Sequence, residues 1–335
     1  MGIRAFAARR ARGRLEAFVY TPERLGPHDV ELRISHCGIC HSDVHLVDGD
    51  WGVGEYPMVP GHEIVGTVAA RGARVRQLEP GQRVGVGWQS GACLECDACV
   101  RGEENLCPHE AATCVGRHGG FAERIRLDAR FAFPIPETLA SEHAAPLLCG
   151  GVTVYAPLRR HVRPGMSVGV IGIGGLGHLA LQFARAMGCE VTALSASADK
   201  ETEAHAFGAH RFVLTRGSRG LRSAAGALDF LLSTVFTRLD VAPLLDTLRP
   251  NGLLCFVGVP EAPLRLDVGS MLGRQLGVAT SAIGGRAAIR EMLDFAARHG
   301  TLPKVQLLPL AQANAALAQV RKGRARYRVV LAVPQ

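Results

Sequence analysis

Hydrophobic positions follow two different patterns along the chain. Up to about residue 90, apolar residues form short runs that are interrupted by glycine and proline, as in strands joined by turns. Strands are expected at residues 15–20, 30–34, 63–70 and 83–86. This pattern predicts an all-β, barrel-like domain.

From Ser167 onward, apolar strands alternate with helical segments. The expected strands are 168–171, 190–194, 211–214, 228–233, 252–257 and 276–281, with helices between them such as 179–187 and 241–248. Six strands joined by crossovers predict a doubly wound parallel sheet, so the fold class is α/β.

The last segment is expected to leave this sheet. Helices at 287–299 and 311–322 and a strand at 327–333 would return to the first domain. A chain of 335 residues suits two domains, because one domain usually holds roughly 100 to 200 residues. We predict a discontinuous first domain at 1–148 and 287–335, and a second domain at 149–286.

Composition excludes several classes of protein. Hydrophobic residues make up 47% of the chain and charged residues 20%, and no apolar run approaches the roughly 18 residues of a membrane span. The net charge of +8 comes almost entirely from arginine, because the chain has only three lysines. Apart from Arg321 to Arg328 these charges are scattered, without interleaved aromatic residues. We therefore expect no nucleic-acid partner and no membrane association.

The N-terminus and the cysteines bear on the compartment. The arginine-rich start superficially resembles a transit peptide but lacks serine and an apolar segment, so it is interpreted as the first hairpin of a cytoplasmic protein. The length of the chain and the lack of a signal peptide argue against a disulfide scaffold for its ten cysteines. Three of them are expected to be buried small hydrophobic residues: Cys114, Cys189 and Cys255.

Four cysteines follow the pattern Cys-x₂-Cys-x₂-Cys-x₇-Cys in a loop rich in glycine and charge. They are Cys93, Cys96, Cys99 and Cys107. Four thiolates complete the tetrahedral shell of a zinc ion and leave no open position, so this zinc would be structural and would stabilise a lobe without its own core. An iron–sulfur cluster is the alternative, but its common spacings match this one imperfectly.

A second set of metal ligands is spread along the chain. Cys40 in Gly-Ile-Cys-His-Ser-Asp, His62 in Gly-His-Glu and Cys149 in Leu-Leu-Cys-Gly-Gly offer two thiolates and one imidazole. Three ligands leave the fourth position for water or a substrate oxygen, which is typical of catalytic zinc. Ser42 would reach an oxygen held there, and His45 would carry a proton outward. Taken alone, Ser42 is also a common helix N-cap and His45 a common surface residue.

A glycine-rich turn separates the strand expected at 168–171 from the helix expected at 179–187. It has the pattern Gly-x-Gly-x-x-Gly, in which backbone amides and the helix N-terminus hold a pyrophosphate. The residues expected to bind it are Gly172, Gly174, Gly175, Leu176 and Gly177. The position between a strand and a helix predicts a dinucleotide site.

The following strand ends at Ser195, where an enzyme that uses NAD usually carries an acidic residue for the ribose 2′-hydroxyl. No acidic residue stands at this position. Ser195, Ser197 and Lys200 supply hydroxyls and a cation that suit a 2′-phosphate, so NADP(H) is favoured over NAD(H). The alternative is that Ser197 caps a helix and Lys200 is exposed.

These motifs together resemble the zinc-containing medium-chain alcohol dehydrogenases, and among them the cinnamyl-alcohol-dehydrogenase-like branch, over almost the whole chain. The resemblance implies a GroES-like β-barrel catalytic domain, a Rossmann nucleotide-binding domain and two Zn²⁺ per chain. It implies hydride transfer between NADP(H) and a primary alcohol or aldehyde, aliphatic or aromatic. The partners would be this small molecule and further copies of the chain in a homodimer or homotetramer.

The resemblance also implies roles for single residues. The ligands of the catalytic zinc would be Cys40, His62 and Cys149, with Glu63 beside them as a transient ligand or outer partner. Ser42 would take the alcohol proton and pass it through the cofactor ribose to His45.

Further implied roles concern the cofactor and the substrate. His41 would lie near the pyrophosphate and Thr153 near the nicotinamide. The substrate pocket would be lined by Trp51, Trp88 and Ile283.

Three other functions are weighed against this one. A zinc polyol dehydrogenase commonly has a carboxylate as third ligand, where this chain has Cys149. A non-catalytic zinc and nucleotide-binding protein would have lost a ligand or part of the proton path, and a zinc-free quinone reductase would lack both zinc sets. Plant members of the branch carry an aromatic residue near Ala111 and Ala112, so a lignin alcohol is not the expected substrate.

Overall fold

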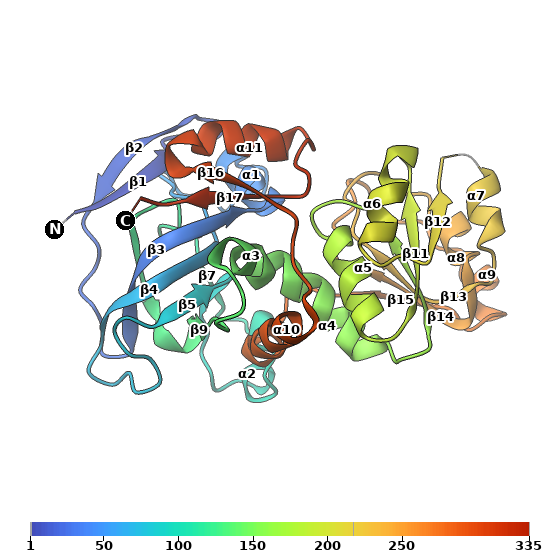
Figure 1. Cartoon of the computed structure of the whole chain (residues 1–335), viewed down its shortest axis with the longest axis horizontal. Helices are drawn as coiled ribbons and strands as arrows, with labels where there is room; N and C mark the ends of the chain where they lie inside the picture. The colour runs from blue at the N-terminus through green and yellow to red at the C-terminus, as the bar shows by residue number, and fades with distance from the viewer. Residues whose placement is uncertain (1, 217, 335) are drawn as a thin grey trace. The chain divides into compact units, whose positions relative to one another are not determined.

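The computed structural model describes residues 2–216 and 218–334. The chain forms two compact units, which we call unit 1 and unit 2. Unit 1 comprises Met1–Val152, Gly284–Arg298 and Leu302–Gln335, and unit 2 comprises Thr153–Ile283 and His299–Thr301. Each unit has its own main sheet (Figure 1).

Unit 1 is built on a seven-stranded sheet in the order β16-β17-β3-β4-β5-β9, with β8 paired to β3. The strands are β3 (Asp29–Ile39), β4 (Glu63–Arg71), β5 (Arg83–Val86), β8 (Arg124–Asp128), β9 (Phe133–Pro134), β16 (Val305–Pro309) and β17 (Arg328–Ala332). The C-terminal strand β17 pairs antiparallel with β3, so segments about 290 positions apart in the sequence share one sheet. The prediction of a β-rich first domain is confirmed.

Smaller elements complete unit 1. β1 (Ile3–Ala8) and β2 (Leu15–Tyr20) form an antiparallel hairpin, which confirms the hairpin predicted at the N-terminus. β6 (Gln89–Gly91) pairs with β7 (Ala111–Ala112). The helical elements are α1 (His41–Asp48), α2 (Asp97–Val100), η1 (Glu104–Leu106), η2 (Ala129–Phe131), α3 (Ser141–Pro146), η3 (Leu147–Gly151), α10 (Arg286–His299), η5 (Leu310–Gln312) and α11 (Ala313–Arg321).

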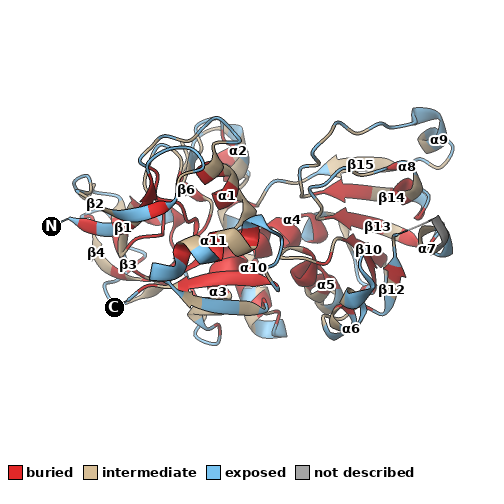
Figure 2. Cartoon of the chain, turned by 90° about the horizontal axis from the view of Figure 1, so that it is seen from above, coloured by how far each residue is buried: buried red, intermediate tan, exposed pale blue. Residues whose placement is uncertain are grey.

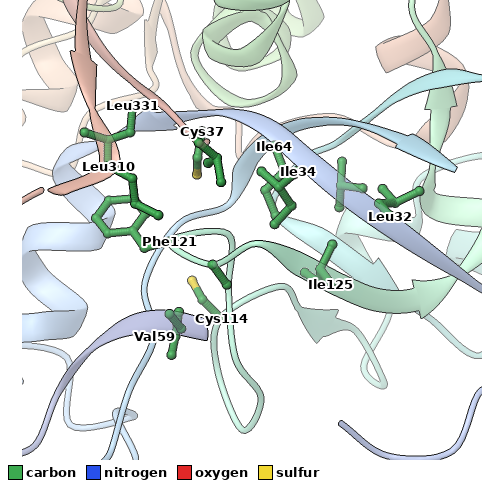
Figure 3. Packing of buried hydrophobic residues seen from close by; sticks show 14 of the residues in the cluster. Leu32, Ile34, Cys37, Val59, Ile64, Cys114, Phe121, Ile125, Leu310 and Leu331 are labelled. Carbon is green, nitrogen blue, oxygen red and sulfur yellow. The ribbon is translucent and has the colours of Figure 1, made fainter. Parts of the chain in front are cut away.

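The core of unit 1 fixes the strands that carry the chemistry. Leu32 and Ile34 of β3, Ile64 of β4 and Leu331 of β17 are fully buried and belong to one cluster with Phe121 (Figure 3). Burying a side chain of this size contributes about 1.5–3 kcal/mol. The cluster therefore holds the end of β3 beside the start of β4.

Unit 2 is a six-stranded parallel sheet in the order β12-β11-β10-β13-β14-β15. The strands are β10 (Ser167–Ile171), β11 (Glu190–Ser195), β12 (Arg211–Leu214), β13 (Leu228–Ser233), β14 (Leu248–Phe256) and β15 (Gly277–Thr280). The chain order reverses between β10 and β13, as in dinucleotide-binding folds. These two central strands are buried almost throughout (Figure 2). The predicted doubly wound sheet is confirmed.

The helices of unit 2 differ in one place from the prediction. They are α4 (Val152–His161), α5 (Gly177–Ala186), η4 (Ala198–Lys200), α6 (Glu201–Ala206), α7 (Ser218–Ser223), α8 (Ala242–Leu245) and α9 (Val268–Leu272). The helix expected at 241–248 ends early, because Thr247 donates its hydroxyl to Leu244 O (2.7 Å) and the chain enters β14 at Leu248. Within residues 2–216 and 218–334, none of the helices has the length and apolar character of a membrane span.

Candidate active site

The site begins where β3 passes into α1. Cys40 is the N-cap of α1, with an extended backbone (φ −103°, ψ 161°). Asp43, at the third position of the helix, accepts a hydrogen bond from the Cys40 N–H (2.8 Å) and completes a capping box. The alternative in which Ser42 caps a helix is wrong, because Ser42 lies inside the first turn. A helix was expected here only in that alternative, because the apolar pattern of this part indicates strands.

His62 and Glu63 stand at the start of β4, next to the end of β3. Gly38 of β3 pairs with Glu63, and a Cβ at Gly38 would lie 2.1 Å from Glu63 Oε2. Gly61 has φ +105°, a conformation that favours glycine, and donates its N–H to Asp43 Oδ1 (2.9 Å). These two glycines allow the His62–Glu63 pair to approach Cys40.

Cys149 comes from a third segment. It lies in η3, a single π-helical turn between α3 and α4, and is 7% exposed. Such turns occur frequently at functional sites. One ligand atom from each of Cys40, His62, Glu63 and Cys149 lies within 4.8 Å of the others. The fold thus brings the three predicted zinc ligands and Glu63 together.

The donor atoms fit a zinc ion. His62 Nδ1 lies 3.1 Å from Asp43 Oδ1, and its Nε2 is buried without a hydrogen bond of ordinary geometry to any residue that the structure describes. A carboxylate on one ring nitrogen and a metal on the other is the usual arrangement of a ligating histidine. The Cys149 thiol hydrogen-bonds Cys40 and, helped by His62, holds the pKa of Cys40 well below its ordinary value.

Glu63 has a charged partner that sequence reasoning missed. Arg328 of β17 donates to Glu63 Oε1, and the two side chains are 6% and 0% exposed. Burial raises the pKa of Glu63 to about 7, although Arg328 opposes this change. Glu63 Oε2 has no hydrogen-bond partner among the described residues. The sequence carried no signal for this pair, because its members are 265 positions apart.

Asp43 is the second functional candidate that was missed. It is fully buried and joins Cys40, Gly61 and His62 through its two carboxylate oxygens. The capping pattern of a carboxylate three positions after Cys40 was a signal that could have found it. Cys114 is buried as predicted, but its thiol lies near the ligand atoms of Asp43 and His62 rather than among apolar groups alone.

The predicted proton path starts beside the metal cluster. Ser42 Oγ lies 3.6 Å from Cys40 Sγ. His45, one turn along α1, has Nδ1 2.9 Å from Asp50 Oδ2 and stacks on Trp51 at 5.3 Å between ring centroids. The His41 ring lies 5.4 Å from that of His45, and burial lowers the pKa of His41. His45 is thus held on two sides.

Two tryptophans stand next to the cluster. Trp88 meets the His62 ring edge-on, with centroids 4.9 Å apart, and Trp51 lies 6.2 Å from Trp88 in a T-shaped pair. Both belong to unit 1, whereas Thr153 and Ile283 belong to unit 2. Thr153 is buried, and Ile283 has φ +51°, which is unusual for a β-branched residue.

The four remaining predicted ligands form a separate cluster around α2 and η1. Sγ atoms of Cys93, Cys96, Cys99 and Cys107 lie within 4.8 Å of one another. Cys93 Sγ is 3.9 Å from Cys99 Sγ and 3.5 Å from Cys107 Sγ, close to the roughly 3.8 Å expected between sulfurs bound to one zinc. Backbone N–H groups, led by that of Glu95, lower the pKa of Cys93 to about 6. The cluster fits a zinc ion with a closed shell.

The glycine-rich turn of unit 2 has the three glycine roles of a dinucleotide motif. Gly172 has φ +90°, and a Cβ there would lie 2.6 Å from Val235. A Cβ on Gly174 would meet no atom within 4 Å, so the space beside its backbone is open. A Cβ on Gly177, which begins α5, would lie 1.8 Å from Gly172 O. The three glycines thus give, in order, a tight turn, open space beside the backbone and close packing of the helix. This combination suits a pyrophosphate. Gly175 and Leu176 complete the turn.

Ser195 and Ser197 are hydrogen-bonded to each other at the end of β11. Ser195 Oγ accepts from the Ser197 N–H and donates to Ser197 O, both at 3.2 Å. Ser197 occupies the N-cap of η4, but its hydroxyl makes no capping hydrogen bond, and Lys200 is only partly exposed. Ser197 therefore stands at the N-cap position of the alternative, but without the capping hydrogen bond.

Comparison with known proteins gives the same assignment along the chain. Residues 26–137 match the alcohol dehydrogenase GroES-like domain, and residues 175–298 match the zinc-binding dehydrogenase domain. The chain is 45% identical to the aldehyde reductase AdhA of Synechocystis over 330 residues, which cover 98% of both proteins.

Solved structures agree with this. The structure of a cinnamyl alcohol dehydrogenase from Sorghum bicolor has a TM-score of 0.95 and 36% identity, covering 99% of this chain and 98% of that one. The cinnamyl alcohol dehydrogenase of Helicobacter pylori, complexed with NADP(H), has a TM-score of 0.92 and 32% identity over the same shares.

These likenesses extend over nearly the whole chain. The protein is an oxidoreductase of the alcohol dehydrogenase class, with zinc and a nucleotide as cofactors. It belongs to the zinc-containing medium-chain alcohol dehydrogenases, in their cinnamyl-alcohol-dehydrogenase-like branch.

Proposed function

We propose that the protein is an NADPH-preferring, zinc-dependent reductase of hydrophobic aldehydes that also oxidises the corresponding primary alcohols. The observation that carries this proposal is the buried, unpartnered His62 Nε2 beside the Cys40 and Cys149 thiols. Cys40, His62 and Cys149 would hold one zinc, and the four-cysteine lobe a second. Unit 1 is the catalytic domain and unit 2 the nucleotide-binding domain.

The residues around the first zinc would have different roles in the reaction. When bound, zinc supplies a Lewis acid that polarises a carbonyl or alcohol oxygen, and the nicotinamide supplies or takes the hydride. Ser42 exchanges the proton of the substrate oxygen, and His45 passes it to solvent while Asp50 orients its ring. Asp43 holds His62 in the tautomer whose Nε2 is free to bind the metal.

Glu63 and Arg328 affect the net charge of the metal site. When zinc is bound, the Cys40 and Cys149 thiolates would offset its charge, and the Arg328 guanidinium would offset a negative charge on the Glu63 carboxylate beside it. Glu63 is close enough to the cluster to serve as a transient ligand when substrate or product leaves. Its ion pair with Arg328 restrains it for the rest of the cycle.

The preference for NADPH rests on unit 2. Ser195, Ser197 and Lys200 offer two hydroxyls and a cation after β11, and the residue that ends this strand is Ser195 and not an acidic residue. The structure of the Helicobacter pylori relative contains NADP(H), which supports the same choice. His41 and Thr153 would contact the cofactor in addition to the glycine turn.

The substrate preference rests on the tryptophans. Trp51 and Trp88 present apolar surface next to His62, and Ala111 and Ala112 leave that side of the wall small. The name of the Synechocystis relative, an aldehyde reductase, supports reduction as the main direction. We further propose a cytoplasmic homodimer or homotetramer, with the edge strand β15 as the pairing strand.

The test is NADPH oxidation, followed by nicotinamide absorbance, with aliphatic, aromatic and sugar aldehydes before and after chelation. We expect turnover with hydrophobic aldehydes, loss of turnover on chelation, recovery with added Zn²⁺ and two zinc ions per chain. Silence of the zinc-replete protein across the panel would contradict the proposal. A preference for sugars would favour the polyol dehydrogenase, and activity with NADH alone would refute the assignment of Ser195, Ser197 and Lys200.

A further inference from the structure

The four-cysteine lobe holds the start of α10. Glu104 of η1 lies between Cys99 and Cys107 in the sequence, and its carbonyl accepts from the Cys107 N–H (3.1 Å). The Glu104 side chain binds outside the lobe. Its Oε2 accepts from the N–H of Arg286, the first residue of α10 (2.9 Å), and its Oε1 accepts from Arg286 Nε (2.6 Å). One carboxylate thus binds both the backbone and the side chain at the start of this helix.

This contact is buried and closely packed. The Glu104 side chain is 2% exposed and that of Arg286 is 23% exposed. Burial acts to raise the pKa of Glu104, but the hydrogen bonds from Arg286 outweigh it and lower the pKa. A Cβ on Gly285 would overlap Gly102 O, so the backbone before α10 lies directly on the lobe. A carboxylate at the first turn of a helix is stabilising, because the N–H groups there have no partner within the helix.

The same helix packs against η3, the turn that carries the third predicted zinc ligand. A Cβ on Gly151, the last residue of η3, would lie 3.2 Å from Met292 Sδ of α10. A Cβ on Gly87 would lie 2.5 Å from Leu148 O and 3.9 Å from Ile289 Cδ1, so this glycine lies between η3 and α10. Met292 and Ile289 are both buried. In the sequence, Leu148 and Gly151 stand on either side of the ligand.

These contacts form a continuous path within unit 1, from the lobe through the ion pair and α10 to η3. A single π-helical turn such as η3 is rare, and we expect its shape to depend on the residues packed around it. Sites joined by packed side chains and ion pairs can influence each other's affinity, typically by about 5–150-fold. Loosening the start of α10 should therefore be felt at η3.

We propose that Glu104 is a positioning residue that links the two cysteine clusters: it holds α10 against η3 and so supports Cys149 as a zinc ligand. The lobe then serves the open metal site as well as its own stability. The zinc part of this inference rests on the proposed assignment of the two zinc sites. The link from Glu104 to η3 does not.

Paired variants test the first step of this link. Glu104→Gln removes the charge and one acceptor oxygen, and Arg286→Gln removes the guanidinium. Each should lower the zinc affinity of the open site about tenfold, which is within the range of coupled sites. The double variant should lose no more than either single variant, because all three lack the same ion pair. Glu95→Gln removes an exposed carboxylate of the same lobe and is the matched control, with both zinc affinities as in the wild type.

Two measurements separate this role from a general loss of stability. Competition with a chelator of known affinity measures the zinc sites, and Cys149→Ala gives the value for the lobe alone. The lobe affinity should stay near that of the wild type, because its four thiolates are unchanged. Amide hydrogen exchange in excess Zn²⁺ should be faster at residues 147–151 and 286–292 and unchanged in the β1–β2 hairpin. In excess Zn²⁺, kcat should also stay near the wild type, since the ligands themselves are retained.

Met292→Ala tests the second step. It removes the packing of α10 against Gly151 and leaves the Glu104–Arg286 pair in place, so it should weaken the open site and not the lobe. Thermal unfolding shows whether this variant is folded. If it is not, the single variants of the ion pair decide the question.

Unchanged open-site affinity and unchanged exchange in Glu104→Gln and Arg286→Gln would overturn the inference. Equal losses at both zinc sites would also overturn it, because the ion pair would then only stabilise unit 1 as a whole. A folded Met292→Ala variant with normal zinc affinity would remove the path through α10. A wild type that bound fewer than two zinc ions would refute the zinc assignment, and the exchange of residues 147–151 would still decide whether Glu104 supports η3.

Discussion

The two cysteine clusters of unit 1 assemble metal ligands in opposite ways. The four-cysteine lobe takes all its proposed ligands from residues 93–107, and backbone N–H groups of this part of the chain hydrogen-bond the sulfurs of Cys93 and Cys107. The other cluster takes its ligands from β3–α1, from the start of β4 and from η3. Three buried ionisable side chains lie around it, those of Asp43, Glu63 and Arg328.

We propose that this difference separates a structural zinc site from a reactive one. A closed shell of four sulfurs needs only a loop of the right spacing, and it offers no place for a substrate. The other cluster has three proposed ligands, one of them through the unpartnered His62 Nε2, and a carboxylate nearby. These residues come from distant segments, so a folded core is needed to hold them, and three ligands leave the fourth coordination position of a zinc ion open. Changes in the first cluster should therefore act on stability, and changes in the second on turnover.

The largest effect is expected from Cys149→Ala. Removing one of three ligands from the open site should lower kcat by at least about 10³-fold and release one of two zinc ions, since two remaining ligands bind zinc poorly. The lobe keeps its own ligands, so the other zinc should stay. Metal content and NADPH oxidation measured on the same sample check this. Two zinc ions in an inactive variant would contradict the assignment of Cys149 as a ligand.

Cys93→Ser should show the reverse profile. The lobe has a short helix and a helical turn but little core, so loss of its zinc should lower the free energy of unfolding by about 3 kcal/mol and expose residues 93–107 to proteolysis. The remaining folded enzyme should keep one zinc and a kcat within about tenfold of the wild type. Thermal unfolding, limited proteolysis and metal analysis test this. A Cys93→Ser variant that was as inactive as Cys149→Ala but as stable as the wild type would contradict the distinction between the clusters.

The two clusters also differ in how far their structure could be predicted from the sequence. The four cysteines of the lobe are close together in the sequence, so their spacing alone predicted the cluster that the structure shows. The parallel sheet was predictable because each buried strand is a continuous apolar run, and the glycine turn because its conformations need glycine. Cys40, His62 and Cys149 were recognised through motifs, and the structure brings them within 4.8 Å.

What the sequence did not predict depends on packing between distant segments. Arg328 reaches Glu63 only because β17 pairs with β3, and nothing near Arg328 in the sequence indicates that contact. The helix α1 was missed because its surroundings have strand periodicity, and its capping by Cys40 and Asp43 follows from the position of Cys40 at the end of β3. The helix expected at 241–248 was too long because periodicity cannot detect the Thr247 turn.

Asp43→Asn tests the outer support of the reactive cluster. The amide keeps the size of the side chain but weakens the bonds to His62, Cys40 and Gly61, so the His62 tautomer is less well fixed. Loss of such a partner typically costs about 10–100-fold in activity or metal affinity. We expect this loss in kcat/KM and in zinc affinity of the open site, with the lobe zinc unchanged. Competition with a chelator of known affinity measures it, and a variant with normal zinc affinity and turnover would show that Asp43 serves only as a helix cap.

The smallest effect is expected far from both clusters, at Lys200. If the Lys200 ammonium pairs with a 2′-phosphate, Lys200→Gln should raise KM for NADPH about tenfold, which is the weight of one charge-assisted contact at a partly exposed site. KM for NADH, kcat and both zinc ions should stay unchanged, because NADH has no phosphate there and Lys200 lies in unit 2. Ser195→Asp is the complementary change, since a carboxylate repels the 2′-phosphate and accepts a bond from the 2′-hydroxyl. It should therefore move the preference toward NADH. Equal changes for both cofactors in the two variants would mean that these residues support β11 and do not read the ribose. The two clusters would still account for the stability of the lobe and for the reaction itself. The preference between NADPH and NADH would have to come from another part of the protein.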